Sequence, residues 1–556
     1  MVASGLGISA SPREGRPAPL LESLDAEQRA AALLPDGPAL IIAPAGSGKT
    51  TTLIARLGVL LDRGVPPEQI AVVTFNRAAA VDLADRLARR LAPSMPGAGR
   101  IEVRTLHALA RQILLDAGVP VRLAPDRLPL LRAARRRAAV SRGSEDPPLP
   151  EAAALDTIVS AWKVEQREPP PGTRPIIEAY ADLLALRGEL DFDDLVAGAV
   201  ARLDAHPALR LRWQARFSHL AVDEFQDVDA AQFRLVQILA APQDNLFVVG
   251  DDDQTIYAWR LADVRRMLDF DRHYPGARRV QLATNYRCPR SVVAASARLV
   301  AVNRERYVKV IHAAPGRHAA AAEIAELPTD RPEWPDLVAA EAARAAAATD
   351  RCCVLARTRA ELIPVQLAML RMGLRHATSL AGPLEAEPVV RMLDGARRLP
   401  GTEAPFGALL RLRTVFGWRR GGEDDSVGDE HHAALDALLG WAAAFRTLNA
   451  FLAGADAAAA RMAALRDPSA PIELVTVHGS KGREWPTVII IGFEEERMPN
   501  RRARVDAADP ARALEEERRL AYVALTRATQ RLVLAFDPQQ PSPFLVEMGL
   551  RLSSAG

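Results

Sequence analysis

Lysine is scarce in this sequence. Only four of its 71 lysine and arginine residues are lysines, at positions 49, 163, 309 and 481, so the place of each retained lysine is informative. Acidic residues nearly balance the basic ones, with 69 Asp and Glu and a net charge of +2. A chain so close to neutral has no global electrostatic attraction for nucleic acid or a membrane surface. Any groove that binds nucleic acid must therefore be local.

Cysteines and long apolar runs are also few or lacking. The three cysteines, at positions 288, 352 and 353, have no C-x-x-C spacing, which argues against a zinc site and a disulfide framework and fits a reducing compartment such as the cytosol. No apolar run approaches the roughly 18 residues of a membrane span, and the first 20 residues lack the apolar core of a signal peptide. We expect a cytoplasmic protein that does not enter a membrane, with a disordered extension over residues 1–20.

What is present has an ordinary globular composition, with 49% apolar and 25% charged residues in 556 positions. At roughly 150 residues per domain this length predicts about four domains. Short apolar runs alternate with amphipathic helical stretches, the pattern of parallel sheets flanked by helices. Two groups of such runs predict two α/β units: 40–43, 71–75, 220–222 and 246–250 in the first, and 353–356, 474–477, 488–492 and 532–536 in the second.

Two segments interrupt the alternation of strands and helices. Residues 108–215 and 382–470 are rich in helix formers, and we expect both to be mainly helical insertions. Five arginines of the first segment form a basic run, which a solvated helix face explains more readily than a nucleic-acid patch: Arg132, Arg135, Arg136, Arg137 and Arg142.

The segment Ala43–Thr50, APAGSGKT, follows the first expected strand. Its two glycines would let backbone N–H groups curl around phosphates at the start of a helix. In that arrangement Lys49 reaches the β- and γ-phosphates and Thr50 binds Mg²⁺. The rest of the loop would contribute to the same nucleotide site: Ala45, Gly46, Ser47, Gly48 and Thr51. The alternative is a chance glycine-rich turn, so the segment needs a partner carboxylate.

That partner follows a later apolar strand. Asp223 and Glu224 would emerge at the carboxyl edge of the sheet, beside the phosphate loop. Asp223 can hold Mg²⁺ while Glu224 polarises the attacking water. An acidic cap on the next helix is the alternative for this pair alone. Together the two segments indicate hydrolysis of a nucleoside triphosphate.

A third strand leads into Val249–Arg260, VGDDDQTIYAWR. Gln254 lies where a sensor of the γ-phosphate would lie. Tyr257, Trp259 and Arg260 combine ring faces with a cation, as platforms for single-stranded nucleic acid do. Aromatic residues make up only 5% of the chain, so two within three positions stand out. Core packing remains an equal alternative for Trp259 alone.

These motifs, with several further segments, resemble the UvrD/Rep/PcrA-like branch of superfamily 1 helicases from about residue 20 to about residue 545. The further segments are 24–28 (LDAEQ), 71–79 (AVVTFNRAA), 105–107 (TLH), 280–287 (VQLATNYR), 354–358 (VLART), 475–485 (VTVHGSKGREW) and 515–528 (EEERRLAYVALTRA).

The resemblance implies two RecA-like P-loop motor domains, each with a mainly helical insertion. The first motor domain would comprise residues 21–107 and 216–279, and the second residues 280–381 and 471–548, while the insertions are 108–215 and 382–470. The second insertion, at about ninety residues, is shorter than is usual in the family. No Gly-Ile-Gly-type segment for holding duplex DNA is found in it.

The resemblance also implies residue roles. For ATP, Gln28 would read the base, Tyr286 would stack on it, Glu484 would contact the ribose, and Arg287 and Arg527 would act as arginine fingers on the γ-phosphate. For DNA, the contacts would be Phe75, Thr105, His107, Arg357, Thr476 and His478. The Lys49 and Glu224 side of the site would then lie on one motor domain and the two fingers on the other.

The implied function is ATP-dependent movement along single-stranded DNA in the 3′ to 5′ direction, with unwinding of duplex at single-strand to double-strand junctions, in DNA repair or replication. ATP and Mg²⁺ are the implied cofactors, proteins of repair or replication are possible partners, and the chain would act as a monomer. One alternative is a translocase that displaces proteins or unwinds only with a partner. Another is an ATP-gated DNA-binding scaffold without turnover.

Overall fold

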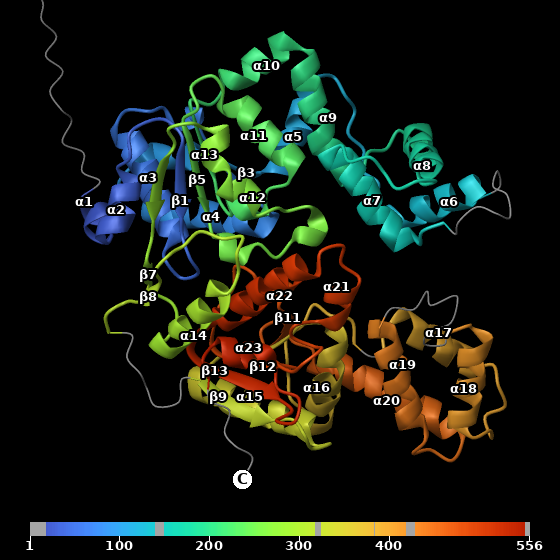
Figure 1. The fold of residues 1–556 in the computed structure, drawn as a ribbon. Coiled ribbons are helices and arrows are strands. Elements are labelled where there is room, and N and C mark those ends of the chain that lie inside the picture. Colours follow the sequence, from blue (N-terminus) through green and yellow to red (C-terminus); the bar gives the residue numbers. More distant parts are fainter. Residues whose placement is uncertain (1–17, 140–148, 317–323, 383, 419–428, 551–556) are drawn as a thin grey trace, which may run out of the picture. The chain divides into compact units, whose positions relative to one another are not determined.

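The structure, a computed structural model, describes residues 18–139, 149–316, 324–382, 384–418 and 429–550. The chain divides into two compact units, of which the first ends at Ala283 and the second begins at Thr284 (Figure 1). Each unit has a parallel sheet flanked by helices and a separate group of helices. The expected α/β class is therefore confirmed.

The first unit is built on a six-stranded parallel sheet with the order β3-β2-β4-β5-β1-β6. The four inner strands are buried along their whole length, which explains why each is a continuous apolar run in the sequence. The strands are β1 (Ala39–Ile42), β2 (Ile70–Thr74), β3 (Glu102–Thr105), β4 (His219–Val222), β5 (Leu246–Gly250) and β6 (Arg278–Gln281). The flanking helices are α1 (Ala18–Glu22), α2 (Ala26–Ala32), α3 (Lys49–Asp62), α4 (Arg77–Arg90), α11 (Ala230–Ala240), α12 (Arg265–Leu268) and α13 (Phe270–His273).

The two edge strands of this sheet were not expected from the sequence. Charged residues occupy alternate positions of β3 and the first two positions of β6. One side of an edge strand meets solvent, so neither strand forms a continuous apolar run in the sequence. Strand β6 pairs with β1. Residues 280–283 therefore belong to the first unit, whereas the second motor domain was expected to begin at residue 280.

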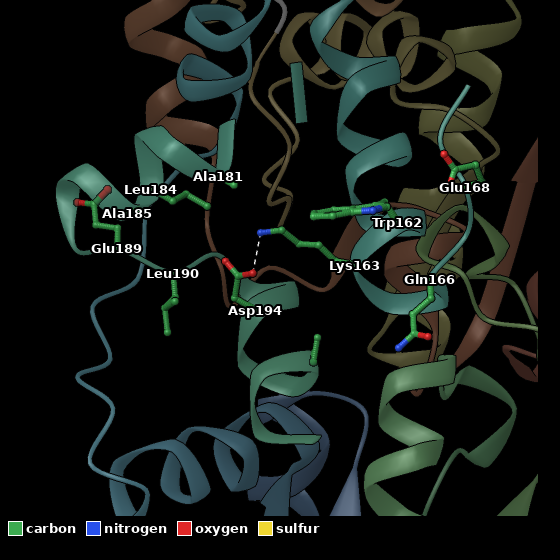
Figure 2. Close-up of a pocket in the computed structure, with 11 residues that line it drawn as sticks. Trp162, Lys163, Gln166, Glu168, Ala181, Leu184, Ala185, Glu189, Leu190 and Asp194 are labelled. Carbon is green, nitrogen blue, oxygen red and sulfur yellow. Dashed lines mark ion pairs between the residues drawn. The ribbon is translucent and has the colours of Figure 1, made fainter. Parts of the chain in front are cut away.

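Among the described residues, six helices follow β3 and precede β4. They are α5 (Leu106–Asp116), α6 (Leu128–Ala139), α7 (Ala152–Glu165), α8 (Arg174–Arg187), α9 (Phe192–Ala205) and α10 (Pro207–Gln214). Helices α6, α7 and α8 form a group beside the sheet (Figure 1) with an apolar core of their own around Leu131, Leu155 and Ile177. A cavity opens where α7, α8 and α9 meet (Figure 2). Arg142, the last residue of the basic run, lies outside the described residues.

The second unit has a five-stranded parallel sheet with the order β11-β10-β12-β13-β9 and a two-stranded sheet of β7 and β8. All four strands expected here are present, and the edge strand β9 was missed. The strands are β7 (Thr284–Asn285), β8 (His312–Ala313), β9 (Ile324–Pro328), β10 (Cys352–Ala356), β11 (Ile472–Thr476), β12 (Trp485–Ile491) and β13 (Ala528–Phe536). The helices are α14 (Arg290–Ala301), α15 (Trp334–Thr349), α16 (Arg359–Met372), α21 (Arg501–Val505), α22 (Pro510–Leu525) and α23 (Pro543–Glu547).

Four helices are described between α16 and β11, with a separate apolar core around Met392, Leu435 and Phe451. They are α17 (Glu387–Ala396), α18 (Pro405–Val415), α19 (Asp429–Ala442) and α20 (Leu448–Leu465). In the part of the chain that is described, no helix has the length and apolar character needed to cross a membrane. The expected N-terminal extension lies outside the described residues except for 18–20, which begin α1.

Candidate functional site

The segment Ala43–Thr50 joins β1 to α3 at the carboxyl edge of the first sheet. Gly46 and Gly48 have φ angles of 73° and 83°, a backbone region that favours glycine. A Cβ atom at Gly48 would lie 2.5 Å from the side-chain nitrogen of Gln28. The loop is therefore tightly bent, and it needs glycine there for two independent reasons.

Gln28 packs against this loop from α2. Its side-chain N–H donates to the backbone oxygen of Ser47 at 2.9 Å, and its side-chain oxygen accepts from the N–H of Asp25 in the cap of α2. Only 5% of Gln28 is exposed. The residue expected to read the base thus lies beside the loop expected to hold the phosphates.

Asp223 and Glu224 follow β4, the strand next to β5 in the sheet. The Nζ atom of Lys49 lies 3.9 Å from Oε1 of Glu224, and the N–H of Glu224 donates to Asp223 at 3.0 Å. Burial and the adjacent Glu224 carboxylate raise the pKa of Asp223 to about 7, although Lys49 opposes the shift. The structure therefore brings the expected lysine and both expected acids together.

A chain of side-chain contacts connects Glu224 to the residue expected as a sensor. The side-chain N–H of Gln226 donates to Glu224, and its oxygen accepts from the N–H of Asp251 at 3.0 Å. Asp251 in turn accepts from Gln254 at 2.7 Å and from the N–H of Ala45, in the phosphate loop, at 3.0 Å. Neither Gln226 nor Asp251 was assigned a role from the sequence. Their signal was position alone: Asp251 lies in the segment Val249–Arg260, and Gln226 lies two residues after Glu224.

Three threonines, at positions 50 to 52, follow Lys49 at the start of α3. Thr50 is half-buried in its first turn, after Lys49. The hydroxyl of Thr51 instead accepts from the side chain of Arg90 on α4 at 3.2 Å. Within the described residues no group of three or more His, Cys, Asp or Glu side chains is arranged to hold a metal ion. A metal at Asp223 would therefore need other ligands, as phosphate oxygens and water usually provide for Mg²⁺.

The aromatic residues expected to contact DNA lie together in the first unit. The rings of Phe75 and Tyr257 are stacked with centroids 5.0 Å apart. The ring of Trp259 meets Tyr257 edge-on at 6.2 Å, and the guanidinium of Arg260 lies 4.8 Å from the Trp259 ring. Trp259 is 58% exposed, which excludes core packing for it. The group has the composition of a stacking platform.

His107 extends this set toward the helical insertion. Its ring contacts the 57% exposed Phe192 at 6.0 Å, a residue that the sequence did not single out. Burial lowers the pKa of His107; the Asp193 carboxylate opposes this shift and Arg260 adds to it. Thr105 caps α5, because its hydroxyl oxygen accepts from the N–H of Ala108 at 3.1 Å. Phe192 is thus the more exposed ring of the pair, while Thr105 has a structural task in capping α5.

In the second unit, Arg287 and Arg527 converge on Thr526. Arg287 forms an ion pair with Glu484 at 2.5 Å and donates to the backbone oxygen of Thr526 at 3.4 Å. Arg527 is 1% exposed, donating to the backbone oxygens of Val523 at 2.9 Å and of Arg483 at 3.2 Å. Three of the residues expected at the nucleotide thus share one site. Tyr286, next to Arg287, is 39% exposed.

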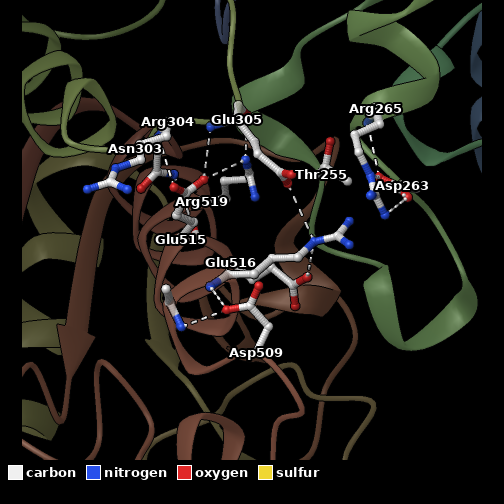
Figure 3. A network of polar contacts seen from close by, with 12 residues as sticks. Thr255, Asp263, Arg265, Asn303, Arg304, Glu305, Asp509, Glu515, Glu516 and Arg519 are labelled. Atoms are coloured by element: carbon white, nitrogen blue, oxygen red, sulfur yellow. Dashed lines mark hydrogen bonds and ion pairs between the residues drawn. The ribbon is translucent and has the colours of Figure 1, made fainter.

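The helix that leads to Thr526 is fixed by a polar network (Figure 3). In α22, Glu515 accepts the N–H groups of Arg304 and Glu305 at 2.9 and 3.2 Å. Arg519 donates to the backbone oxygen of Glu305 at 2.6 Å. Because 303–305 follows α14, this network ties the segment after Arg287 to the helix before Arg527.

The remaining expected DNA contacts lie at the carboxyl ends of β10 and β11. Thr476 ends β11 and His478 begins a short 3₁₀ helix, His478–Ser480. Arg357 follows β10 and forms a bidentate ion pair with the buried Glu517, with a shortest distance of 2.7 Å. Glu517 neutralises the guanidinium inside the unit, so Arg357 would have to leave this pair to bind a phosphate.

Known proteins are similar to this chain in sequence. Residues 24–275 match the family described as the UvrD/REP helicase N-terminal domain, and residues 435–538 match the UvrD-like helicase C-terminal domain. The chain is 28% identical to the ATP-dependent DNA helicase UvrD2 of Mycobacterium tuberculosis, over 95% of this chain and 82% of that protein. It is 26% identical to the ATP-dependent DNA helicase PcrA of Leuconostoc citreum, over 96% of this chain and 86% of that protein.

Proposed function

This chain belongs to the UvrD/Rep/PcrA-like branch of superfamily 1 and is an ATP-dependent DNA helicase, and we propose that it moves 3′ to 5′ on single-stranded DNA and unwinds duplex ahead of it. It would act in DNA repair or replication, in the cytoplasm. It would act as a monomer and bind other proteins of those processes. Single strands and their junctions with duplex are the proposed substrates.

One observation supports the proposal most directly. Lys49, on the phosphate loop, lies 3.9 Å from Glu224, while Asp251 connects the same loop to Gln254. Hydrolysis needs a cation at the transferring phosphate and a base for the attacking water, and these residues provide both at the carboxyl edge of one sheet.

The Asp223 carboxylate fits a role as a Mg²⁺ ligand. Burial, together with repulsion from the adjacent Glu224 carboxylate, raises its pKa to about 7, and a bound divalent cation would favour the ionised form. We propose that Asp223 and Thr50 hold Mg²⁺ there with the phosphates of ATP. The bound ion would neutralise charge on those phosphates during hydrolysis.

The protein residues have distinct proposed tasks. Lys49 binds the β- and γ-phosphates, Glu224 accepts the proton of the attacking water, and Gln254 senses the γ-phosphate. The loop atoms of Ala45, Gly46, Ser47, Gly48 and Thr51 surround the phosphates, and Gln28 reads the base. Because Gln28 already bonds Ser47, base binding would be communicated to the loop.

We propose that residues of the second unit also contact ATP. Arg287 and Arg527 would stabilise charge at the γ-phosphate, Tyr286 would stack on the base and Glu484 would contact the ribose. The ion pair between Arg287 and Glu484 would have to open for both roles. Arginine fingers contribute about a thousandfold or more to hydrolysis, so turnover should require both units.

Single-stranded DNA would bind the exposed ring of Trp259 with Phe75, Tyr257 and Arg260 around it. His107 and Thr105 in the first unit, and Arg357, Thr476 and His478 in the second, would contact the backbone or bases. Contacts on both units are what stepping requires, because the grip of each can then change separately during a cycle.

A second candidate is a translocase that displaces proteins, or that unwinds only with a partner. The observation that favours it is the size of the second insertion, whose four described helices lie between Glu387 and Leu465. A small insertion offers little surface for holding duplex DNA.

Direction is tested without duplex by displacing streptavidin from biotin at one end of a single strand. We expect ATP-dependent displacement from the 5′ end, toward which a 3′ to 5′ motor moves, and none above background from the 3′ end. Displacement only from the 3′ end would contradict the proposed direction. The Glu224→Gln variant supplies the control without turnover.

A further inference from the structure

The side chain of Arg266 joins three segments of the first unit. Arg266 lies in α12, and 14% of its side chain is exposed. Its Nη1 atom donates to the backbone oxygen of Leu261 at 2.8 Å and to that of Val228 at 3.3 Å. Its Nη2 atom donates to Oε1 of Glu165 at 3.2 Å. One guanidinium therefore contacts two loops and a helix of the insertion.

The first of these segments is the turn that carries Trp259. Leu261 ends this turn with a φ angle of 65°, in the left-handed region where a leucine is strained. Its N–H donates to the backbone oxygen of Ala258 at 2.9 Å. A strained residue keeps such a conformation only where its surroundings enforce it. The bond from Arg266 to the Leu261 oxygen is one of the contacts that do so.

The second segment follows the proposed base. A short 3₁₀ helix, Phe225–Asp227, begins directly after Glu224, and Val228 ends it. Val228 is 2% exposed, and its N–H donates to the backbone oxygen of Phe225 at 3.2 Å. The oxygen that Arg266 binds is therefore one short, buried turn away from Glu224. A displacement of Val228 can reach Glu224 through the backbone alone.

The third segment is the carboxyl end of α7, whose last residue is Glu165. A carboxylate at this end of a helix is unfavourable, because the helix dipole is negative there. Arg167 and Arg266 both pair with Glu165 and offset this cost. Arg266 thus finds its counter-charge on the insertion, which fixes the direction of its guanidinium. Hydrogen bonds from a charged group to the two carbonyl oxygens are stronger than those from a neutral donor.

The charge of Arg266 also acts on the helix that follows Val228. Asp229 caps α11 by accepting the N–H of Gln232 at 2.8 Å. Burial raises the pKa of Asp229 to about 6, although the N–H of Gln232 and the charge of Arg266 oppose the shift. Arg266 therefore favours the ionised form of this cap.

We propose that Arg266 is a positioning residue that transmits the binding of single-stranded DNA at the Trp259 turn to the loop of Glu224. This inference rests on the proposed function. A base stacked on Trp259 would move the turn that ends at Leu261, and the shared guanidinium would move Val228 with it. The planar guanidinium presents donors in several fixed directions, so one side chain can hold all three segments.

The experiment measures the ratio of two ATPase rates, with saturating oligo(dT) and without DNA. Arg266→Gln should lower this ratio by about fivefold or more, the size of a typical coupling between two sites. Saturating DNA removes the effect of weaker binding. A loss of folded protein would lower both rates by the same factor, so a merely structural role would leave the ratio unchanged.

Arg272→Gln is the matched control. Arg272 is an 81% exposed arginine on α13 that pairs with Asp269, and its loss should leave the ratio unchanged. Glu165→Gln keeps the bonds of Arg266 to the two carbonyl oxygens and removes its counter-charge, so it should lower the ratio less than Arg266→Gln. Adding it to Arg266→Gln should lower the ratio no further, because both residues act through one contact.

An unchanged ratio in Arg266→Gln, or an equal fall in Arg272→Gln, would overturn the proposal. So would effects of Arg266→Gln and Glu165→Gln that multiply in the double variant, because the two residues would then act independently. If DNA did not stimulate the unaltered chain, the proposed function would fail and this inference with it. Stimulation of the unaltered chain with an unchanged ratio in Arg266→Gln would overturn this inference alone.

Discussion

Glu224 has a φ angle of 52°, in the left-handed region that side chains rarely adopt. Such a conformation costs on the order of 1 kcal/mol or more and persists only where the surroundings enforce it. Here the N–H of Glu224 donates to the adjacent Asp223 carboxylate. Lys49 and Gln226 both contact the carboxylate of Glu224. The bend aims Glu224 at the phosphate loop, where a base is needed.

Replacing Glu224 by Gln should therefore separate binding from turnover. The amide keeps the size of the side chain but cannot accept a proton, so we expect DNA-stimulated ATPase activity to fall by about a hundredfold or more. Binding of ATP should persist, measured with a fluorescent analogue. Glu68→Gln, an exposed acid paired with Arg100, is the control. Turnover near that of the control would exclude Glu224 as the base.

Trp259 supports a second prediction at this scale. Its ring is 58% exposed and neighbours both Tyr257 and Arg260. A base stacked on such a ring is worth about 1–3 kcal/mol, so Trp259→Ala should weaken single-strand binding by roughly 5- to 150-fold. Fluorescence anisotropy of a labelled oligonucleotide measures this loss of affinity.

Phe406→Ala is the matched control for Trp259→Ala, because Phe406 is a 46% exposed aromatic on α18, in the second unit. This control should bind single strands normally. If the two variants bound equally well, Trp259 would have no part in the DNA platform.

Among secondary-structure elements, burial decides what the sequence could predict. The inner strands β1, β2, β4 and β5 were predicted because both faces are covered and the runs are wholly apolar. Strands β3, β6 and β9 lie at sheet edges and mix polar with apolar residues. No continuous apolar run in the sequence therefore predicted them.

In the candidate site, the sequence predicted the residues of local motifs but not the contacts between distant segments. Residue types in local motifs predicted Lys49, Asp223 and Glu224, because the chemistry of phosphates restricts those positions. Asp251 and Gln226 connect segments distant in the chain, and only the sheet order brings them together. Likewise, nothing in the local sequence indicated that Glu517 pairs with Arg357.

The cap of α16 yields a prediction about pH. Glu361 accepts the N–H of Thr358 at 3.0 Å in a capping box, and burial raises its pKa from 4.5 to about 6. The folded state therefore holds its proton more tightly than the unfolded state, and stability falls as pH rises from about 4.5 to about 6.

Glu361→Gln keeps the capping geometry and removes the buried charge. We expect the variant to be more stable than the unaltered chain by about 1 kcal/mol above pH 6.5, an amount reduced for the partial exposure of Glu361, and equally stable near pH 4. Urea unfolding of both proteins across this range measures the difference. A constant difference at all pH values would contradict the assignment.

For the whole molecule, charge predicts how salt affects binding. The net charge of +2 provides no long-range field, so single-strand affinity must come from a few local cations and stacked rings. With roughly three phosphate contacts, affinity should fall about twentyfold between 50 and 200 mM salt. Anisotropy titrations at several salt concentrations give this slope, and a flat response would mean that phosphates contribute nothing.

If the chain is a 3′ to 5′ helicase, strand separation tests it most directly, with the purified chain, ATP and Mg²⁺ on matched duplexes carrying a 3′ or a 5′ single-stranded tail. We expect opening of the 3′-tailed duplex alone. Opening of only the 5′-tailed duplex, or of neither despite DNA-stimulated ATPase activity, would contradict it, and the latter result would leave the translocase as the better description.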